Sequence, residues 1–313
     1  MTSDDIARLP GSRSIETYSA LSPDQIEAVL GLLAEAAAAD GQQAVSEQGR
    51  LQLRGGPREG VAHLLLTVGD ELAGYAQLED TDPVEAPAAE LVVRPSHRGH
   101  GHGRALGSAL LAASGRRLRV WAHGGHASAR HLAQVLGLTL FRELRQMRRP
   151  LTDLDLPEPV LPEGVTVRTF VPGEDDTAWL AVNAAAFAHH PEQGSLTQRD
   201  LDDRKAEPWF DPRRLLPRRA GDGQRPGTRR LPLDEGARRG TARRGLRPRC
   251  RPPEAQGTGL GKALTVIGLR HLAGQRLPTA MLYVDADNKA AVSVYERMGF
   301  TTYETDLMYR SET

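Results

Sequence analysis

The chain has 313 residues, with 40 Lys and Arg against 40 Asp and Glu, and 39% of its residues are hydrophobic. This length is typical of about two domains, and the zero net charge argues against binding to a polyanion through bulk charge. The single cysteine, Cys250, excludes an intrachain disulfide and a cysteine metal cluster. There is no 18-residue apolar run, and the amino terminus lacks the basic and apolar regions of a signal peptide, which predicts a cytoplasmic protein without a membrane partner.

The predicted elements alternate between helix and strand, which indicates a mixed α/β fold class. Residues 22–40 predict a helix with Ser22 as its N-cap. The other elements expected in the first half are a β-hairpin at 64–68 and 72–76, a strand at 89–93, a helix at 105–113 and a strand at 117–121.

The stretch 150–163, rich in proline and acidic residues, predicts a linker between a domain at 1–149 and a domain at 164–313. The second domain is expected to begin with a strand at 165–168 and a helix at 176–187. A further helix is expected at 263–272.

A glycine-rich loop occurs twice. Arg98-Gly-His-Gly-His-Gly103 and Gln256-Gly-Thr-Gly-Leu-Gly261 both fit Gln/Arg-x-x-Gly-x-Gly, and both lead into a predicted helix. Farther along, residues 121–138 align without a gap on residues 283–300. Because the spacing is about 160 residues, the repeated unit is a whole domain, and the sequence indicates an internal duplication.

A glycine-rich loop that opens a helix is an anion site, because the first helical N–H groups lack intrahelical partners and the helix dipole is positive there. Neither loop contains the Gly-Lys-Ser/Thr of a P-loop. Neither is the strand–GxGxxG of a dinucleotide fold with its following acidic residue.

The loops resemble the acyl-CoA-binding motif of the GCN5-related N-acetyltransferases, and Asn288-x-x-Ala291-x-x-x-Tyr295-x-x-x-Gly299-Phe300 resembles that family's second signature. The resemblance implies tandem α+β acetyltransferase domains with acetyl-CoA as cosubstrate. The residues that it implies for acetyl-CoA binding are Leu91, Val92, Val93, Gly99, His100, Gly101, His102, Gly103, Arg104, Gln256, Gly257, Thr258, Gly259, Leu260, Gly261, Lys262, Asn288, Lys289, Ala290, Ala291, Val292 and Ser293.

The segment 212–253 does not fit this fold, because it has fourteen Arg but no Lys, Val, Ile or aromatic residue where the second domain needs strands. A disordered basic insert would leave that domain without central strands. A one-base frame shift, with a free choice of synonymous codons, converts residues 214–220, 230–237 and 243–252 into strand-like sequences. We therefore hypothesise an extra base near Pro212 and a compensating loss near Pro253.

Several stretches resemble the mycothiol synthase family of actinobacteria, namely residues 89–93, 121–124, 146–151, 183–187, 190–194 and 209–212, together with the frame-restored Gly-Phe-His-Trp-Thr-Lys-Val-His. That resemblance implies acetyl transfer from acetyl-CoA to the cysteinyl amine of cysteinyl-glucosaminyl-inositol. The expected partner is this small molecule alone, without nucleic acid, and the protein is expected to be a monomer.

The resemblance implies that Tyr295 is the acid that protonates the departing thiolate, and that Glu47, Glu192 and Tyr283 bind the substrate. The position aligned with Tyr295 in the first domain is Ala133, so catalysis is assigned to the second domain. From the residues alone, glutamates such as these two are more often solvated surface acids, and the two tyrosines are as often packing residues.

Two functional residues of the family are missing from the sequence as written. The substrate lysine and the general-base glutamate belong to frame-restored sequences whose codons straddle Glu235/Gly236 and Arg244/Gly245. We therefore expect the chain as written to be poorly ordered over 213–253 and to have little or no activity. Six histidines lie between His97 and His131, but they lack a helical His-x-x-x-His pair backed by acids, so no metal is expected.

Two alternative functions stay open at this point. One is an aminoglycoside or protein N-acetyltransferase. The other is a non-catalytic acetyl-CoA-binding protein whose arginine-rich segment grips an acidic partner, for which salt-sensitive binding to nucleic acid would be evidence.

Overall fold

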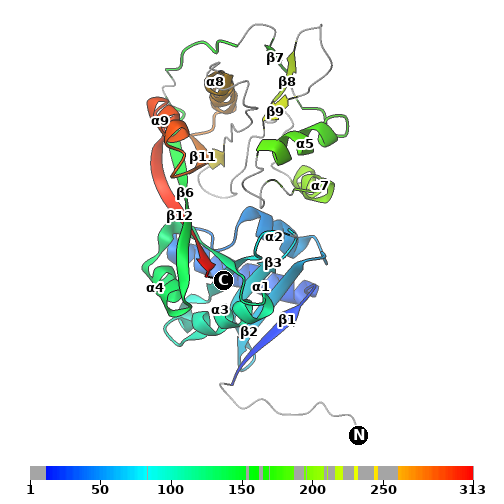
Figure 1. Cartoon of the computed structure of the whole chain (residues 1–313), viewed down its shortest axis with the longest axis vertical. Coiled ribbons are helices and arrows are strands. Elements are labelled where there is room, and N and C mark those ends of the chain that lie inside the picture. The colour runs from blue at the N-terminus through cyan, green and yellow to red at the C-terminus, as the bar shows by residue number, and fades with distance from the viewer. Residues whose placement is uncertain are drawn as a thin grey trace. The chain divides into compact units, whose positions relative to one another are not determined.

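The structure is a computed structural model, and it describes residues 12–82, 84–152, 155–161, 165–168, 170–186, 194, 196–207, 210, 216–220, 229–231, 243–245 and 260–312. These residues form two compact units, which we call the first unit (Met1–Glu143 with Thr305–Thr313) and the second unit (Leu144–Glu304). Figure 1 labels most of their elements.

The first unit is a twisted sheet with helices on both faces. Its elements are β1 (Arg13–Tyr18), α1 (Pro23–Asp40), α2 (Glu47–Arg54), β2 (Val61–Val68), β3 (Glu71–Glu79), β4 (Ala88–Val93), η1 (Pro95–His97), α3 (His102–Ala113), β5 (Arg119–Ala122), η2 (His123–Gly125), α4 (Ala127–Val135) and the start of β6 (Leu138–Pro150). Strands β1 to β4 pair antiparallel in chain order, whereas β4 and β5 are parallel.

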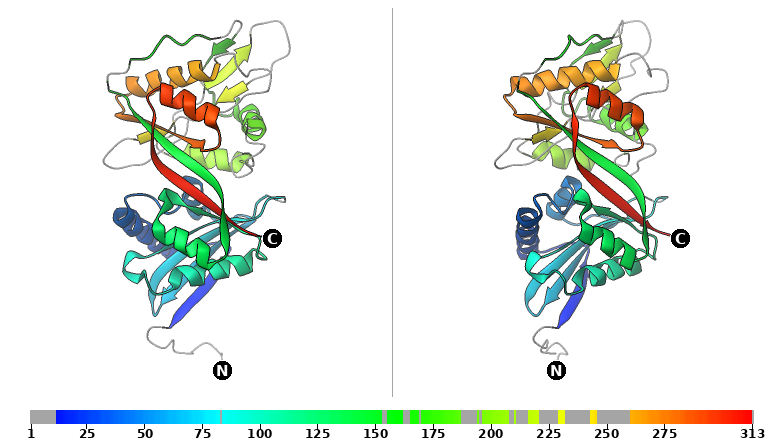
Figure 2. Two further views of the ribbon diagram at one scale, coloured as in Figure 1. Left: turned by 60° about the vertical axis from the view of Figure 1, so that its left-hand side comes forward. Right: turned by 90° about the vertical axis from the view of Figure 1, so that its left-hand side faces the viewer.

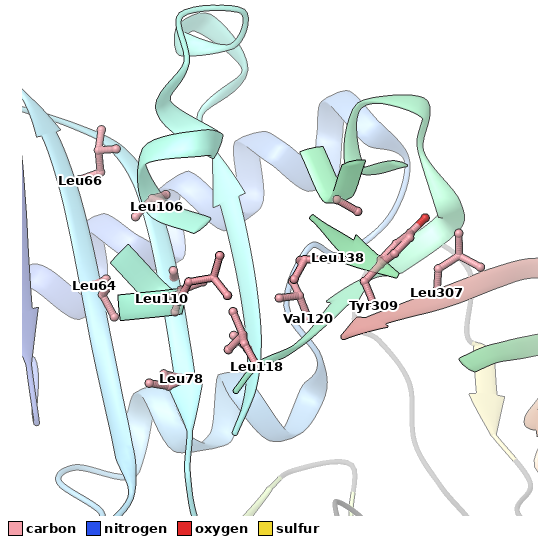
Figure 3. Close-up of a cluster of buried hydrophobic side chains, with 14 of the residues drawn as sticks. Leu64, Leu66, Leu78, Leu106, Leu110, Leu118, Val120, Leu138, Leu307 and Tyr309 are labelled. Carbon is pink, nitrogen blue, oxygen red and sulfur yellow. The ribbon is translucent and has the colours of Figure 1, made fainter. Parts of the chain in front are cut away.

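Two apolar clusters lie on opposite faces of this sheet, as the alternation of side chains along its strands requires. On one face, Leu106 and Leu110 of α3 pack against Leu64, Leu66 and Leu78 of the strands (Figure 3). On the other face, the cluster joins α1 to the strands and includes the fully buried Tyr75. Figure 2 shows α1 against the sheet.

Local signals in the sequence explain the ends of α1. Ser22 is its N-cap, as predicted, and forms a capping box in which its hydroxyl accepts from the Gln25 N–H at 3.2 Å while the Gln25 side chain accepts from the Ser22 N–H. The helix ends at Gly41, whose φ of 76° favours glycine.

The second unit repeats part of this plan. Its described elements are the rest of β6, β7 (Val165–Val167), α5 (Asp176–Ala186), α7 (Gln198–Ala206), β8 (Leu216–Ala220), β9 (Arg229–Leu231), β10 (Arg243–Gly245), α8 (Leu260–Gly274), β11 (Thr279–Asp285), α9 (Lys289–Arg297) and the start of β12 (Thr301–Ser311). Strand β11 pairs parallel with β10 and antiparallel with β6, and β7, β8 and β9 form a small antiparallel sheet.

The duplication is visible in the registers of the elements. Helices α3 and α8 begin at equivalent loop positions, His102 and Leu260. Helices α4 and α9 begin and end at positions that the alignment of 121–138 with 283–300 makes equivalent, and each is followed by a glycine with positive φ, 68° at Gly137 and 80° at Gly299.

The division into compact units differs from the division at 149 and 164 expected from the sequence. Strand β6 continues through the expected start of the linker at Pro150. The end of β12 pairs with β5, with Leu307 opposite Ala122 and Arg310 opposite Arg119, so these residues belong to the first unit. Strand pairing, which a local pattern of residue types does not record, sets the division.

The arginine-rich segment departs in part from the expectation that 213–253 is poorly ordered. Three stretches of backbone within it, β8, β9 and β10, are paired in sheets. They overlap the three stretches that become strand-like in the shifted frame. The rest of 212–253 lies outside the described residues.

Candidate active site and cofactor loops

The first glycine loop presents a helix start with no side-chain cap. Gly99 and Gly101 have φ of 80° and 78°, and a Cβ added at either would meet nothing within 4 Å. Side chains cap the first turns of α1, α2, α7 and α9, whereas α3, like α4, begins without a side-chain hydrogen bond. The loop therefore leaves helical N–H groups for an anion such as a pyrophosphate.

Strand β4, which leads into this loop, loses its parallel partner early. It pairs with β5 only at Ala88 and Ala89, while its pairing with β3 continues to Val93. At Leu91, Val92 and Val93, β4 therefore forms no pairs with β5. These are residues that the sequence predicts to bind acetyl-CoA. An unpaired strand edge offers N–H and C=O groups to a ligand.

The second loop is described only at its helical end. Leu260, Gly261 and Lys262 form the first turn of α8, and Thr265 Oγ1 donates to the Gly261 carbonyl at 2.7 Å. Residues 256–259 lie outside the described residues, so their predicted contacts with acetyl-CoA stay predictions.

The second signature forms the start of α9. Asn288 is the N-cap, and its Oδ1 accepts from the Ala291 N–H at 3.1 Å. Residues 289–293 make up the following turn. The predicted role of these residues in cofactor binding is untested, but the cap gives Asn288 a structural role.

Tyr295 lies in the core of the second unit. Its side chain is 4% exposed and meets the Phe300 ring edge-on, with the ring centroids 5.9 Å apart. Ala133 occupies the equivalent position of α4 and is also 4% exposed. The fold thus places a phenol in one repeat where the other has a methyl group, and its role as the acid stays a prediction.

The structure places the predicted substrate residues in separate units. Glu47 is the first residue of α2 in the first unit and is half-buried. Tyr283 lies on β11 of the second unit, where its hydroxyl accepts from Gln146 Nε2 at 2.9 Å. Gln146 Oε1 in turn accepts from Arg148 Nε at 2.6 Å, which fixes the orientation of the amide. Glu192 lies outside the described residues.

The structure contains a buried polar cluster beside Glu47 that was not predicted from the sequence. His123 Nε2 lies 2.7 Å from Glu90 Oε1, and His123 Nδ1 lies 3.3 Å from Asp306 Oδ2. The three side chains are 17%, 10% and 8% exposed. We call these three residues, together with Ser46, the Glu90 cluster.

The Glu90 cluster holds a charged imidazole. Burial lowers the pKa of His123, but the hydrogen bonds and charges of Asp306 and Glu90 outweigh burial and raise this pKa to about 10. At neutral pH the cluster is therefore an imidazolium between two carboxylates. Glu90 follows Ala89 on β4, and this acidic residue in an apolar strand was the available signal in the sequence.

Other site types find no support within the described part of the chain. There, no group of three His, Cys, Asp or Glu residues could hold a metal ion, although six histidines occur between His97 and His131. Among the helices that the structure describes, none is long and apolar enough to cross a membrane.

Comparisons with known proteins decide the family. Residues 30–138 match the family model described as Acetyltransferase (GNAT) family, and residues 250–309 match the model described as FR47-like protein. The chain is 74% identical to the mycothiol acetyltransferase of Streptomyces scabiei and 73% identical to that of Streptomyces coelicolor, each over 100% of both chains. The chain belongs to the mycothiol acetyltransferase family.

Solved structures agree on the fold. A GCN5-related N-acetyltransferase from Sphaerobacter thermophilus superposes with a TM-score of 0.65 at 24% identity, covering 95% of each chain. A tandem GNAT protein from the clavulanic acid biosynthesis pathway gives a TM-score of 0.68 at 16% identity, covering 96% of this chain and 98% of the other. The predicted fold class and the acetyltransferase family are confirmed, and acetyl-CoA is the cosubstrate of this family.

Proposed function

We propose that the chain transfers the acetyl group of acetyl-CoA to the cysteinyl amine of cysteinyl-glucosaminyl-inositol, the last step of mycothiol synthesis. The observation that carries this proposal is the 74% identity over the full length of a mycothiol acetyltransferase. Such identity over both units supports a shared substrate as well as a shared fold. Neither an aminoglycoside nor a protein acceptor is favoured by any feature of the described residues.

The chemistry needs three groups. The neutral amine nitrogen attacks the thioester carbonyl, and a backbone N–H beside the bound thioester stabilises the developing oxyanion. The C–S bond then breaks, and the Tyr295 hydroxyl gives its proton to the departing CoA thiolate. A carboxylate acting through water takes the proton that the amine loses, so acetyl amide and CoA thiol are the products.

We assign catalysis to the second repeat because Tyr295 can donate a proton and its counterpart Ala133 cannot. The domains proposed for these roles are 1–149 and 164–313. The uncapped start of α3 and the unpaired edge of β4 support retention of acetyl-CoA by the first repeat. In this assignment, Glu47, Glu192 and Tyr283 hold the hydroxyl-rich acceptor.

We infer that 212–253 is a frame-shifted version of the native segment. Strands β8, β9 and β10 support this inference, because each overlaps a stretch that the other frame makes strand-like. The match to the FR47-like model begins at residue 250, three residues before the end of the arginine-rich segment, which also supports this inference. The restored sequence supplies the glutamate base and the substrate lysine.

The test is an acetyl-transfer assay with acetyl-CoA and the cysteinyl amine, in which released CoA thiol is measured and the product mass is checked. A frame-restored chain should form the acetyl amide. Failure of the restored chain to acetylate this amine, with turnover of an aminoglycoside or a peptide amine instead, would contradict the proposal.

A further inference from the structure

The Glu90 cluster is attached to the helix that carries Glu47. The Ser46 N–H donates to Glu90 Oε1 at 2.9 Å, and the Ser46 hydroxyl donates to Glu90 Oε2 at 3.1 Å. Ser46 is also the N-cap of α2, where its hydroxyl accepts from the Gly49 N–H at 3.1 Å. Glu90 therefore fixes the residue that starts α2, and the next residue is Glu47.

Glu90 is also held by His123, which Asp306 supports in turn. His123, directly after β5, donates to Glu90 and lies against Asp306 of β12. Asp306 Oδ1 also accepts from the Gly124 N–H at 2.9 Å, so the turn that carries His123 is fixed at two points. A carboxylate with three donors from two segments has little freedom to move.

A glycine within α2 allows the helix backbone to approach Glu90 closely, at a cost in helix stability. Gly49 lies inside the helix, where glycine is less favourable than alanine by about 1 kcal/mol. A Cβ at this position would lie 2.7 Å from Glu90 Oε2 and 2.7 Å from Val45 Cγ1. The helix therefore has glycine where its backbone approaches Glu90.

Stability alone is a weak explanation for this cluster. Buried ion groups often contribute no more than well-packed apolar residues would, because their desolvation offsets their attraction. The cluster does fix the position of α2, since its contacts link β4, the turn after β5 and β12 to Ser46, the N-cap of that helix. A side chain that binds a substrate needs such supporting contacts to hold its position.

We propose that Glu90, held by His123 and Asp306, positions Glu47 for the amine substrate by fixing Ser46 and the first turn of α2. This inference rests on the proposed function, in which Glu47 binds the acceptor. Glu90 is a positioning residue in this scheme and touches neither substrate nor acetyl-CoA. Because Gly49 has no Cβ, the backbone of α2 can approach the Glu90 carboxylate closely.

The test compares two Gly→Ala substitutions in the full-length active chain, whose first unit is identical in either reading frame of 212–253. Gly49→Ala places a methyl group against Glu90 Oε2 and should therefore move the carboxylate and the first turn of α2 apart. Gly31→Ala, in α1, is the matched control, because a Cβ there would meet nothing within 4 Å. The KM for the cysteinyl amine and the KM for acetyl-CoA are measured for each, with Glu47→Ala as the reference.

We expect Gly49→Ala to raise the KM for the amine about tenfold, which corresponds to about 1.4 kcal/mol, and to leave the KM for acetyl-CoA and kcat within about twofold. Gly31→Ala should change none of the three. The double variant Glu47→Ala, Gly49→Ala should have the KM of Glu47→Ala alone, because both act through one side chain.

Three results would contradict the inference, and they separate an error in the role of Glu47 from an error in its positioning by Glu90. If Glu47→Ala leaves the KM for the amine unchanged, the proposed role of Glu47 is wrong. If Glu47→Ala raises it and Gly49→Ala does not, the positioning by Glu90 is wrong. If the two effects multiply in the double variant, Gly49 acts by another route, and this also contradicts the inference. Glu90→Gln, which keeps the size of the side chain, serves as the second variant should Gly49→Ala fold poorly.

Discussion

Replacement of His123 by glutamine should strongly destabilise the first unit. The folded-state pKa of about 10 lies about 3.5 units above the ordinary value of 6.5, and each unit corresponds to about 1.4 kcal/mol, so the imidazolium contributes about 5 kcal/mol at most. Loss of one partner from a buried ion group typically costs about 3–5 kcal/mol. Because the side chain is 17% exposed, we expect a loss at pH 7 near the lower end of this range.

The pH dependence of the stability of the first unit tests the same prediction in a second way. A raised pKa means that the stabilisation is complete below the unfolded-state value of 6.5 and is lost as pH rises through the folded-state value of about 10. The native first unit should therefore lose stability between about pH 6.5 and pH 10. The His123→Gln variant should lack this component.

Urea unfolding at several pH values measures both effects. Trp121 reports on the site directly, because its ring stacks on His123 with the centroids 6.3 Å apart. With an m-value of about 2 kcal/mol/M, a loss of about 3 kcal/mol shifts the midpoint by about 1.5 M. His126→Gln, in the same turn and bonded to Gln42 at 2.9 Å, is the control and should cost about 1 kcal/mol or less.

A stabilising charge on His123 is refuted if His123→Gln and His126→Gln have the same unfolding midpoint at pH 7. It is also refuted if the native first unit is equally stable at pH 7 and pH 10. Either result would mean that His123 is neutral in the folded protein and that the two carboxylates are satisfied by other groups.

Three further predictions concern the helix starts and the acid. Ser22→Ala removes the capping box of α1 and should cost about 1 kcal/mol in urea unfolding of the first unit, and an unchanged midpoint would show that the cap is not formed in solution. Gly259→Val should abolish acetyl-CoA binding at the second loop, and unchanged stoichiometry and affinity in calorimetry would contradict that assignment. Tyr295→Phe should lower turnover of the frame-restored chain by about 10²–10⁴-fold, whereas loss of turnover only on substitution in the first loop would reverse the roles of the repeats.

Much of the fold could be predicted because its signals are local. The glycine loops predicted a helix after each loop, although α3 and α8 begin three residues earlier than expected, at His102 and Leu260. The aligned stretches predicted the common register of α4 and α9. Ser22 followed by Gln25 was enough for the cap of α1. These features depend on residues a few positions apart, which a single sequence records.

The Glu90 cluster could not be predicted because its members are distant in the chain. His123 lies 33 residues from Glu90, and Asp306 reaches the neighbouring Gly124 across 182 residues. The pairing of β4 with β5 brings Glu90 near His123, and the return of β12 to pair with β5 brings Asp306 to the same place. In the sequence, His123 was one of six clustered histidines. What distinguishes it is its contact with Glu90 and Asp306, which lie on other strands.

The most direct test of the account is a comparison of the chain as written with a chain in which 213–252 is restored to the other frame. Both are purified and given acetyl-CoA and the cysteinyl amine, and the release of CoA thiol is followed. We predict turnover from the restored chain and no thiol above background from the chain as written, which lacks the glutamate base and the substrate lysine. Robust turnover by the chain as written would show that the arginine-rich segment is native and that another base serves the site.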